Sequence, residues 1–322
     1  MKPAIIGISG LSLTSDEAEL LRGEQPLGVI LFARNVADPA QLCALTSEIR
    51  RALPPDGLVM VDQEGGRVAR LRPPQWRAHP PARALRTERA AWISGALIGL
   101  ECAAAGFDLV AAPVLDVAAR DGHDVIGDRA FSDDPARVAA LGAAFAAGLL
   151  AAGVQPIGKH APGHGRARAD SHKELPVLED VTRADLLPFA ANRGLPWLMT
   201  AHIRYRKRDM HHPATQSAII LRDIIRAPSG IGFGGVLITD DLAMGALTGL
   251  PGERASLALA AGCDVALHCS GVLTESADVL AAIPEATHAC LERLEAARSM
   301  ADGARQTLYA EALAAERTAL LA

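Results

Sequence analysis

The sequence predicts an α/β fold, a single (β/α)8 barrel of the TIM type with a C-terminal helical tail. Eight short apolar runs alternate with helical segments over about 270 residues, the usual size of one such barrel. The runs are continuously apolar, as parallel strands buried on both faces require. No linker rich in Gly, Ser or Pro divides the chain, so we expect one domain over 1–322, with about 284–322 as a helical tail on or beside the barrel. A doubly wound sheet in two halves is the alternative.

Each expected strand is a short apolar run bounded by glycine, proline or polar residues. The eight runs are residues 4–8, 28–32, 58–61, 109–114, 154–158, 197–200, 235–238 and 263–267.

The helices between these strands begin at capping residues, and several end at a glycine. Asp38 and Asp134 each precede a proline, which is the arrangement of an N-cap followed by proline in the first helical turn. The expected helices are residues 15–21, 38–53, 87–105, 133–153, 185–192, 217–226 and 252–261, followed by helical sequence from about 273.

Composition narrows the classes of function. The net charge is -5, with acidic and basic residues interspersed, so no nucleic-acid partner is expected. No segment reaches about 18 uninterrupted apolar residues, and the N-terminal apolar run is too short for a signal peptide, so no membrane partner is expected. The five cysteines are widely spaced without a CxxC pair, which is typical of a reducing compartment. We therefore expect a cytoplasmic protein, and a monomer.

The densest group of reactive side chains follows the expected strand 154–158. It reads Gly-Lys-His-Ala-Pro-Gly-His-Gly-Arg over 158–166, and Asp170 and His172 come shortly after it. One intervening residue lets the Asp170 carboxylate bond the His172 imidazole and fix its tautomer. A lone histidine here would indicate a solvated turn, but so many reactive groups after a buried strand favour a functional loop. The glycine spacing does not fit a dinucleotide-binding fingerprint.

Polar side chains stand where five of the expected strands end. They are Asp62, Asp116, Lys159 with His160, His202 and Asp240. Each one alone could be a helix cap. In a barrel, however, the C-terminal ends of all strands share one face, and that face carries the active site. The sequence therefore predicts an active site built from these strand ends.

Five strings resemble the glycoside hydrolase family 3 β-N-acetylglucosaminidases, the NagZ-type β-hexosaminidases. They are Asp62–Val68 with Arg70, Gly127–Phe131, Lys159–Gly165, Asp170–His172 and Thr239–Met244. The similarity runs in order from about residue 5 to 270. It implies a (β/α)8-type barrel without metal or cofactor. It also implies a cytoplasmic enzyme of cell-wall recycling, which removes non-reducing terminal N-acetylglucosamine from muropeptides that contain 1,6-anhydro-muramic acid.

The resemblance also implies a role for individual residues. It makes Asp240 the nucleophile of a retaining reaction, His172 the general acid/base and Asp170 the partner of His172. The residues it implies for holding the sugar are Asp62, Arg70, Arg129, Lys159 and His160. Adjacent strand residues point to opposite sides, so only one of Asp240 and Asp241 can enter the mouth of the barrel. Without the resemblance, the sequence does not decide which of the two is the nucleophile.

Two features depart from the family pattern. Ala161 stands where the family usually carries phenylalanine, which removes bulk behind Lys159 and His160 and could loosen the site. The segment 204–208 is unusually basic. It is either a solvated loop or a surface that attracts an anionic aglycone.

Several alternatives remain open. A histidine acid/base never becomes anionic, so phosphate could replace water, as in a β-N-acetylglucosaminide phosphorylase; a broader β-glycosidase is also open. A metal-dependent hydrolase would use the ligands His160, His164, His172, His202 and Asp240. Lys159 and two arginines would then crowd positive charge around the metal. The remaining alternative is a non-catalytic sugar-binding barrel.

Overall fold

The eight main strands close into a parallel barrel, which confirms the predicted fold class. The computed structural model describes residues 1–322. Every pair of neighbouring barrel strands is parallel. In order around the barrel the strands are β1 (Lys2–Gly7), β10 (Val265–His268), β9 (Val236–Asp241), β7 (Trp197–Thr200), β5 (Gln155–Ala161), β4 (Leu109–Val110), β3 (Leu58–Val61) and β2 (Pro26–Leu31).

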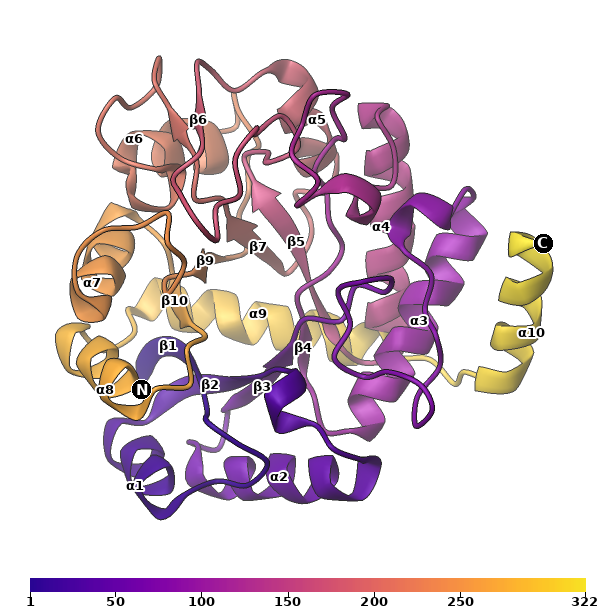
Figure 1. Ribbon diagram of the computed structural model, residues 1–322, viewed down its shortest axis with the longest axis horizontal. Coiled ribbons are helices and arrows are strands. Elements are labelled where there is room, and N and C mark those ends of the chain that lie inside the picture. Colours follow the sequence, from indigo (N-terminus) through magenta and orange to yellow (C-terminus); the bar gives the residue numbers. More distant parts are fainter.

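A helix follows each barrel strand and packs around the outside (Figure 1). The N-cap prediction is confirmed at two of them: the side chains of Asp38 and Asp134 accept hydrogen bonds from the first turns of α2 and α4. The ring consists of α1 (Ser15–Glu24), α2 (Pro39–Ala52), α3 (Glu88–Ala104), α4 (Pro135–Ala151), α5 (Arg183–Ala191), α6 (Ala218–Ile220) continued by the π-helix η5 (Leu221–Arg226), α7 (Pro251–Ala261) and α8 (Leu273–Ala282).

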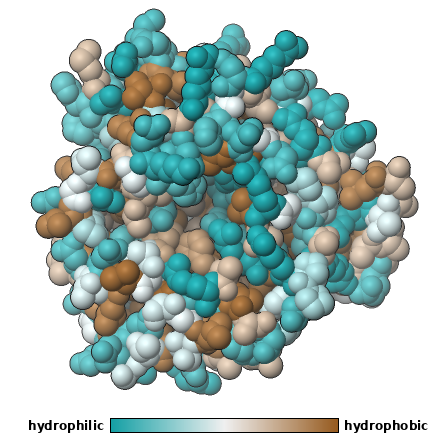
Figure 2. Space-filling view, viewed as in Figure 1, coloured by the Kyte–Doolittle hydropathy of each residue, from teal (hydrophilic) through white to brown (hydrophobic).

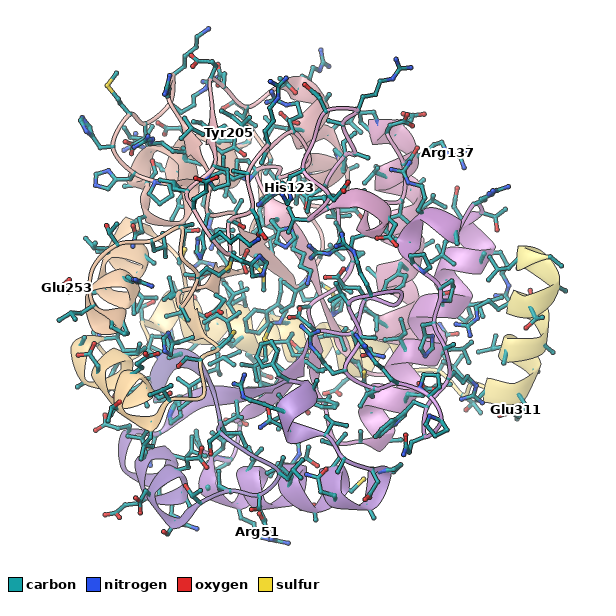
Figure 3. All side chains as sticks on the ribbon, in the orientation of Figure 1. Arg51, His123, Arg137, Tyr205, Glu253 and Glu311 are labelled. Atoms are coloured by element: carbon teal, nitrogen blue, oxygen red, sulfur yellow. The ribbon has the colours of Figure 1, made fainter.

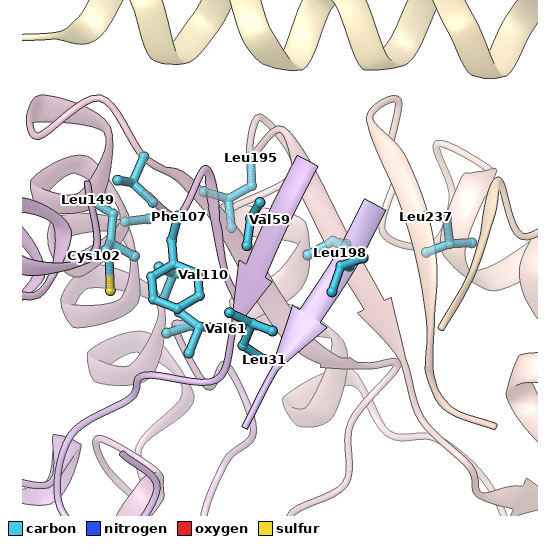
Figure 4. Packing of buried hydrophobic residues seen from close by; sticks show 14 of the residues in the cluster. Leu31, Val59, Val61, Cys102, Phe107, Val110, Leu149, Leu195, Leu198 and Leu237 are labelled. Carbon is cyan, nitrogen blue, oxygen red and sulfur yellow. The ribbon is translucent and has the colours of Figure 1, made fainter. Parts of the chain in front are cut away.

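Side chains of successive strand residues alternate between two apolar layers. On β3, Leu58 and Met60 belong to the cluster inside the barrel, whereas Val59 and Val61 belong to the layer beneath the helices. Figure 4 shows part of this outer layer, where Val61 and Val110 lie near Phe107. The alternation matters for the site, because it decides which residues point into the mouth of the barrel.

The tail consists of two helices rather than one continuous segment. The first, α9 (His288–Ala304), contributes Cys290, Leu294 and Ala297 to the cluster inside the barrel. In Figure 1 it runs behind the strands. The second, α10 (Ala310–Leu321), packs on the outer side of α3. The two helices are separated by residues 305–309.

Three local features differ from the sequence-based expectation. The expected strand 109–114 is regular only over Leu109–Val110, and Pro113 has no N–H to continue a ladder. The expected strand 154–158 extends to Ala161, so that Lys159 and His160 lie within β5. A separate two-stranded sheet, β6 (Val177–Leu178) with β8 (Arg204–Tyr205), was not predicted, because two-residue strands have no detectable apolar pattern.

Short 3-10 helices complete the chain: η1 (Ala33–Asn35), η2 (Ala82–Ala84), η3 (Gly127–Arg129) and η4 (Ala214–Gln216). None of the helices combines the length and apolarity needed to cross a membrane. All five cysteines are free, and four of them are buried.

Candidate active site

Three charged side chains reach the mouth of the barrel because they continue its inward-facing rows. On β9, Val236 and Ile238 point inward, and Asp240 follows them in the same alternation. By the same spacing Asp62 follows Met60, and Lys159 follows Ile157. The strand register therefore brings two carboxylates and an ammonium group to one place.

These groups border a cavity of about 280 Å³. Seven of the eight residues to which the resemblance gives a role line it; the eighth, Asp170, hydrogen-bonds to the lining residue His172. The two other predicted strand-end residues, Asp116 and His202, lie outside the lining. Figure 2 shows a hollow near the middle of the molecular face, with hydrophilic side chains around it. The twenty lining residues include Phe32, Arg34, Asp62, Glu64, Arg70, Arg129, Lys159, His160, His164, His172, Asp240, Asp241 and Met244.

Lys159 is the centre of an ion-pair network on the cavity wall. Its Nζ lies 2.8 Å from Oδ1 of Asp62 and 2.6 Å from Oε1 of Glu64. Arg129 binds the same Glu64 through Nε and Nη2, at 2.8 and 2.9 Å. Arg70 reaches the other oxygen of Asp62 at 3.2 Å. Each charge in this buried wall has a partner, so the wall is fixed before a ligand arrives.

The network controls the protonation of its carboxylates. Burial alone would raise the pKa of Asp62, but Lys159 and Arg70 outweigh it and hold this pKa well below its usual value. Burial is likewise outweighed at Glu64, where Arg129 and Lys159 lower the pKa to about 2. In turn, the two carboxylates overcome burial and raise the pKa of Lys159. All these groups are charged at neutral pH.

Asp240 remains free to react. Its one hydrogen bond comes from the backbone N–H of Asp241, 2.8 Å from Oδ1, and it forms no ion pair. Burial would raise the pKa of Asp240, but the nearby imidazoles of His160 and His202 outweigh it and keep this pKa below the usual value. An ionised carboxylate without a committed partner is what a nucleophile requires.

The adjacent Asp241 has a structural role. Its Oδ1 accepts the backbone N–H groups of Ala243 and Cys269, at 2.8 and 2.9 Å. Its carbonyl oxygen lies 3.0 Å from Nε2 of His202. These contacts join the loop after β9 to the end of β10. The side chain that is free in the cavity is therefore that of Asp240.

His160 is held by a buried carboxylate from the segment that follows β4. Its Nδ1 lies 2.6 Å from Oδ2 of Asp116, and Oδ1 of Asp116 accepts the backbone N–H of His164 at 2.6 Å. Burial would raise the pKa of Asp116, but His160 and His164 keep it low. At His164, burial and the neighbouring His160 lower the pKa to about 4, so this ring is neutral. Asp116 thus directs Nε2 of His160 toward the cavity.

His172 lies on a loop after β5 and is the most exposed of these groups, with 63% of its side chain accessible. Its Nδ1 and its backbone N–H both contact Oδ1 of Asp170, at 2.8 and 3.0 Å. These contacts overcome partial burial and lower the pKa of Asp170. The loop is tied to the one that follows Asp240: Gly245 donates its N–H to the carbonyl of His172 at 3.1 Å, and Ala246 donates to Ser171.

An aromatic ring with two guanidinium groups forms another part of the wall. Arg34 and Arg70 lie over the ring of Phe32, at 5.0 and 5.1 Å from its centroid. Nε of Arg70 is buried without a hydrogen-bond partner. Gln63 fixes the backbone of this region, because its Oε1 accepts the N–H of Arg70 at 2.7 Å. The only hydrogen bond of the Arg70 side chain is the one from Nη2 to Asp62, so its guanidinium group is only partly paired.

The five residues considered as metal ligands do not converge on one point. No group of three or more His, Cys, Asp or Glu side chains is placed to hold a metal ion. His202, one of the five ligands considered, is buried outside the cavity lining and bonds Thr215 and the carbonyl of Asp241. His164 bonds Ser171 instead. These residues do not fit a metal centre.

The basic segment 204–208 does not border the cavity. Arg206 and Arg208 pair with Glu179 and Asp180, which neutralises much of its charge. Tyr205 is buried, and its hydroxyl donates to the carbonyl of Gly163 at 2.6 Å (labelled in Figure 3). The segment thus supports the start of the loop that carries His172. Ala161 is also outside the lining; its side chain belongs to the outer apolar layer.

Comparison with known proteins shows the family of the chain. The model of the glycosyl hydrolase family 3 N-terminal domain matches residues 6–300. The chain belongs to glycosyl hydrolase family 3. A β-hexosaminidase of Pseudomonas aeruginosa is 41% identical over 333 residues, which cover 98% of each chain. A β-hexosaminidase of Tolumonas auensis is 42% identical and covers 84% of this chain and 83% of the relative.

Solved structures of family 3 members show the same architecture. NagZ from Neisseria gonorrhoeae, crystallised with N-trifluoroacetyl-D-glucosamine, superimposes with a TM-score of 0.86 at 32% identity. The match covers 100% of this chain and 98% of that one.

Two residues at or beside the cavity are not functional candidates in the sequence analysis. Glu64 lines the cavity and pairs with Lys159 and Arg129, but in the sequence it is one of several polar residues in a loop. Asp116 was recognised as a strand-end residue but received no role. The signal that could have identified it is its spacing from β4, which places it beside the end of the neighbouring β5.

Proposed function

We propose that this β-N-acetylhexosaminidase is a retaining exo-enzyme, which removes non-reducing terminal N-acetylglucosamine through a covalent ester on Asp240. The observation that carries the proposal is the half-buried, ionised and unpaired Asp240 in a cavity shared with His172. Two β-hexosaminidase relatives and the structure of a family member with an N-acylated glucosamine support the sugar class.

The proposed reaction has two steps. First, a carboxylate oxygen of Asp240 forms a bond to C1 while the bond from C1 to the glycosidic oxygen breaks. His172 donates its proton to the departing oxygen, with its other ring nitrogen held by Asp170. In the second step the neutral imidazole takes a proton from water, whose oxygen attacks C1. The ester breaks, and N-acetylglucosamine leaves while Asp240 is restored.

The ion-pair wall is proposed to bind the sugar hydroxyls. Asp62, Arg70, Arg129, Lys159 and His160 are the proposed ligands of the sugar. Hydrogen bonds to charged groups contribute about 1.5–3 kcal/mol each, more than bonds between neutral groups. A volume of about 280 Å³ is small for a ligand pocket, which favours one sugar unit inside with the aglycone beyond the mouth.

The natural substrate is proposed to be a muropeptide with N-acetylglucosamine linked to 1,6-anhydro-muramic acid, processed in cell-wall recycling. We propose that the enzyme works in the cytoplasm as a monomer. The five free cysteines support a reducing compartment. Light scattering coupled to size-exclusion chromatography tests the monomer, and a muropeptide digest analysed by mass spectrometry tests the substrate.

Turnover of an aryl N-acetyl-β-glucosaminide, followed by proton NMR, tests the reaction itself. Retention predicts that β-N-acetylglucosamine is the first product, before mutarotation. The α-anomer as first product would contradict the covalent mechanism. Formation of N-acetylglucosamine 1-phosphate in phosphate buffer would favour a phosphorylase. Affinity for the sugar without turnover would favour a sugar-binding barrel. Full activity in a chelator is expected.

A further inference from the structure

The loop between β3 and α3 forms a large part of the sugar-binding wall. This loop, residues 62–81, contributes Asp62, Glu64, Val68 and Arg70 to the cavity lining. It has no regular secondary structure over most of its length. Since the proposed ligands of the sugar lie at its start, anything that holds the rest of the loop affects their position.

The loop folds back on itself directly behind Glu64. The N–H of Gly66 donates to the carbonyl of His79 at 2.8 Å. A Cβ on Gly65 would lie 2.4 Å from the carbonyl oxygen of Pro80, and both Gly65 and Gly66 have positive φ angles, 98° and 55°. Because of this close backbone packing, a shift at the end of the loop must move the backbone next to Glu64.

The end of the loop is held in turn by the last helix of the chain. Nη1 of Arg317, on α10, lies 2.8 Å from Nδ1 of His79, and its Nη2 lies 3.4 Å from the carbonyl of Ala78. A guanidinium can only donate, so Nδ1 of His79 accepts and Nε2 donates to Glu101, 3.0 Å away. Burial lowers the pKa of His79, which agrees with a neutral ring. Arg317 itself is buried.

The other contacts of α10 do not involve the backbone of this loop. Leu313 packs among Ile93 and Leu97 of α3, and Arg89 forms an exposed ion pair with Glu316 through two hydrogen bonds, at 2.6 and 2.7 Å. Glu311, at the start of α10 (labelled in Figure 3), pairs with Arg77. The apolar contact and the Arg89 pair also hold α10 on α3, away from the backbone of the loop. The buried Arg317 differs from these contacts, because it binds His79 at the end of the loop.

We infer that Arg317 is a positioning residue for the sugar-binding wall. It acts from α10 through His79 and Gly66 on the neighbouring Glu64, which holds Lys159 and Arg129. The helix at the end of the chain is therefore part of the machinery that sets affinity for the sugar, although it touches no substrate. The kinetic consequence rests on the proposed function, whereas the structural coupling does not.

The test compares Arg317→Ala and Arg317→Lys with the control Arg89→Ala, which removes an α10 ion pair without touching the loop. Arg317→Ala should raise KM for an aryl N-acetyl-β-glucosaminide about fivefold or more, with kcat changed less than about twofold, as expected for lost ground-state binding. Arg317→Lys keeps a donor to His79 and should recover most of the loss. Arg89→Ala should leave KM unchanged.

Hydrogen–deuterium exchange gives a readout that needs no activity. The amides of residues 63–68 should exchange at least about tenfold faster in Arg317→Ala than in wild type or Arg89→Ala. The reason is that the hydrogen bond from the Gly66 N–H to the carbonyl of His79 should open more often. Unchanged exchange there, or an equal KM effect in Arg89→Ala, would overturn the inference. Absence of wild-type turnover would instead refute the proposed function. Should Arg317→Ala not fold, the same two readouts on Arg317→Gln decide.

Discussion

Nδ1 of His160 lies 2.6 Å from Oδ2 of Asp116, a fully buried carboxylate in the segment that follows the neighbouring strand β4. Both oxygens of Asp116 accept hydrogen bonds. Replacing Asp116 by asparagine should weaken the bond to His160 and put an NH2 donor in place of one of these acceptors. Losing hydrogen bonds to a charged group predicts that kcat/KM falls about 10- to 100-fold. Steady-state kinetics measure the fall.

A matched control for Asp116 lies just before β4, the strand that Asp116 follows. Asp108 precedes β4, is similarly engaged by Arg50 and the N–H of Val59, and is remote from the cavity lining. Asp108→Asn should keep wild-type kcat/KM. Equal kinetics in wild type and Asp116→Asn would show that His160 needs no orientation by this carboxylate.

The low pKa of Glu64 predicts a component of stability that depends on pH. Its pKa is about 2 in the folded protein against 4.5 for an ordinary glutamate carboxyl, so the stabilisation is complete above pH 4.5 and is lost as pH falls toward 2. Protonation of Glu64 should lower the unfolding free energy by about 2 kcal/mol between pH 5 and pH 3. Urea unfolding of wild type and Glu64→Gln measures it.

The variant Glu64→Gln is expected to be less stable at pH 7, because Lys159 and Arg129 lose their shared partner. Its stability should nevertheless decline less steeply with acid than that of wild type. Parallel pH profiles for the two proteins would mean that Glu64 titrates normally in the folded state.

The regular elements and most of the site followed from local sequence patterns. Continuous apolar runs identified the parallel strands, and the polar residues at their ends identified Asp62, Lys159 and Asp240. The pairing of Asp116 with His160 depends on which strands are neighbours, over 44 positions in sequence. No local pattern contains that information. Without the resemblance, the choice between Asp240 and Asp241 also stayed open, because it depends on the register that continues Val236 and Ile238.

Removal of the proposed acid/base should have an effect that depends on the leaving group. His172→Ala should slow substrates with poor leaving groups at least about 100-fold, within the range that general acid catalysis contributes. Aryl glycosides with activated leaving groups should lose much less in the first step, because they need little protonation. Rates for a series of aryl N-acetyl-β-glucosaminides measure the difference, and equal loss across the series would exclude the acid role.

The contact between the loops of His172 and Asp240 predicts an effect of Gly245. A Cβ on this residue would lie 2.9 Å from the carbonyl oxygen of His172 and 2.8 Å from that of Lys173, so the loop must shift. Gly245→Ala should lower kcat for poor leaving groups about tenfold, equivalent to about 1.4 kcal/mol in the barrier. Gly194→Ala, where a Cβ meets nothing within 4 Å, is the control and should match wild type. An unchanged kcat in Gly245→Ala would show that the loop contact does not position His172.

The covalent role of Asp240 is tested most directly by trapping the intermediate. An activated fluorinated derivative of N-acetylglucosamine should inactivate the enzyme, and peptide mapping by mass spectrometry then locates the sugar. We predict one label per chain, on Asp240, and none in Asp240→Ala. A label on Asp241 or on any other residue, or turnover with no trapped ester under conditions that inactivate retaining enzymes, would contradict the proposed mechanism.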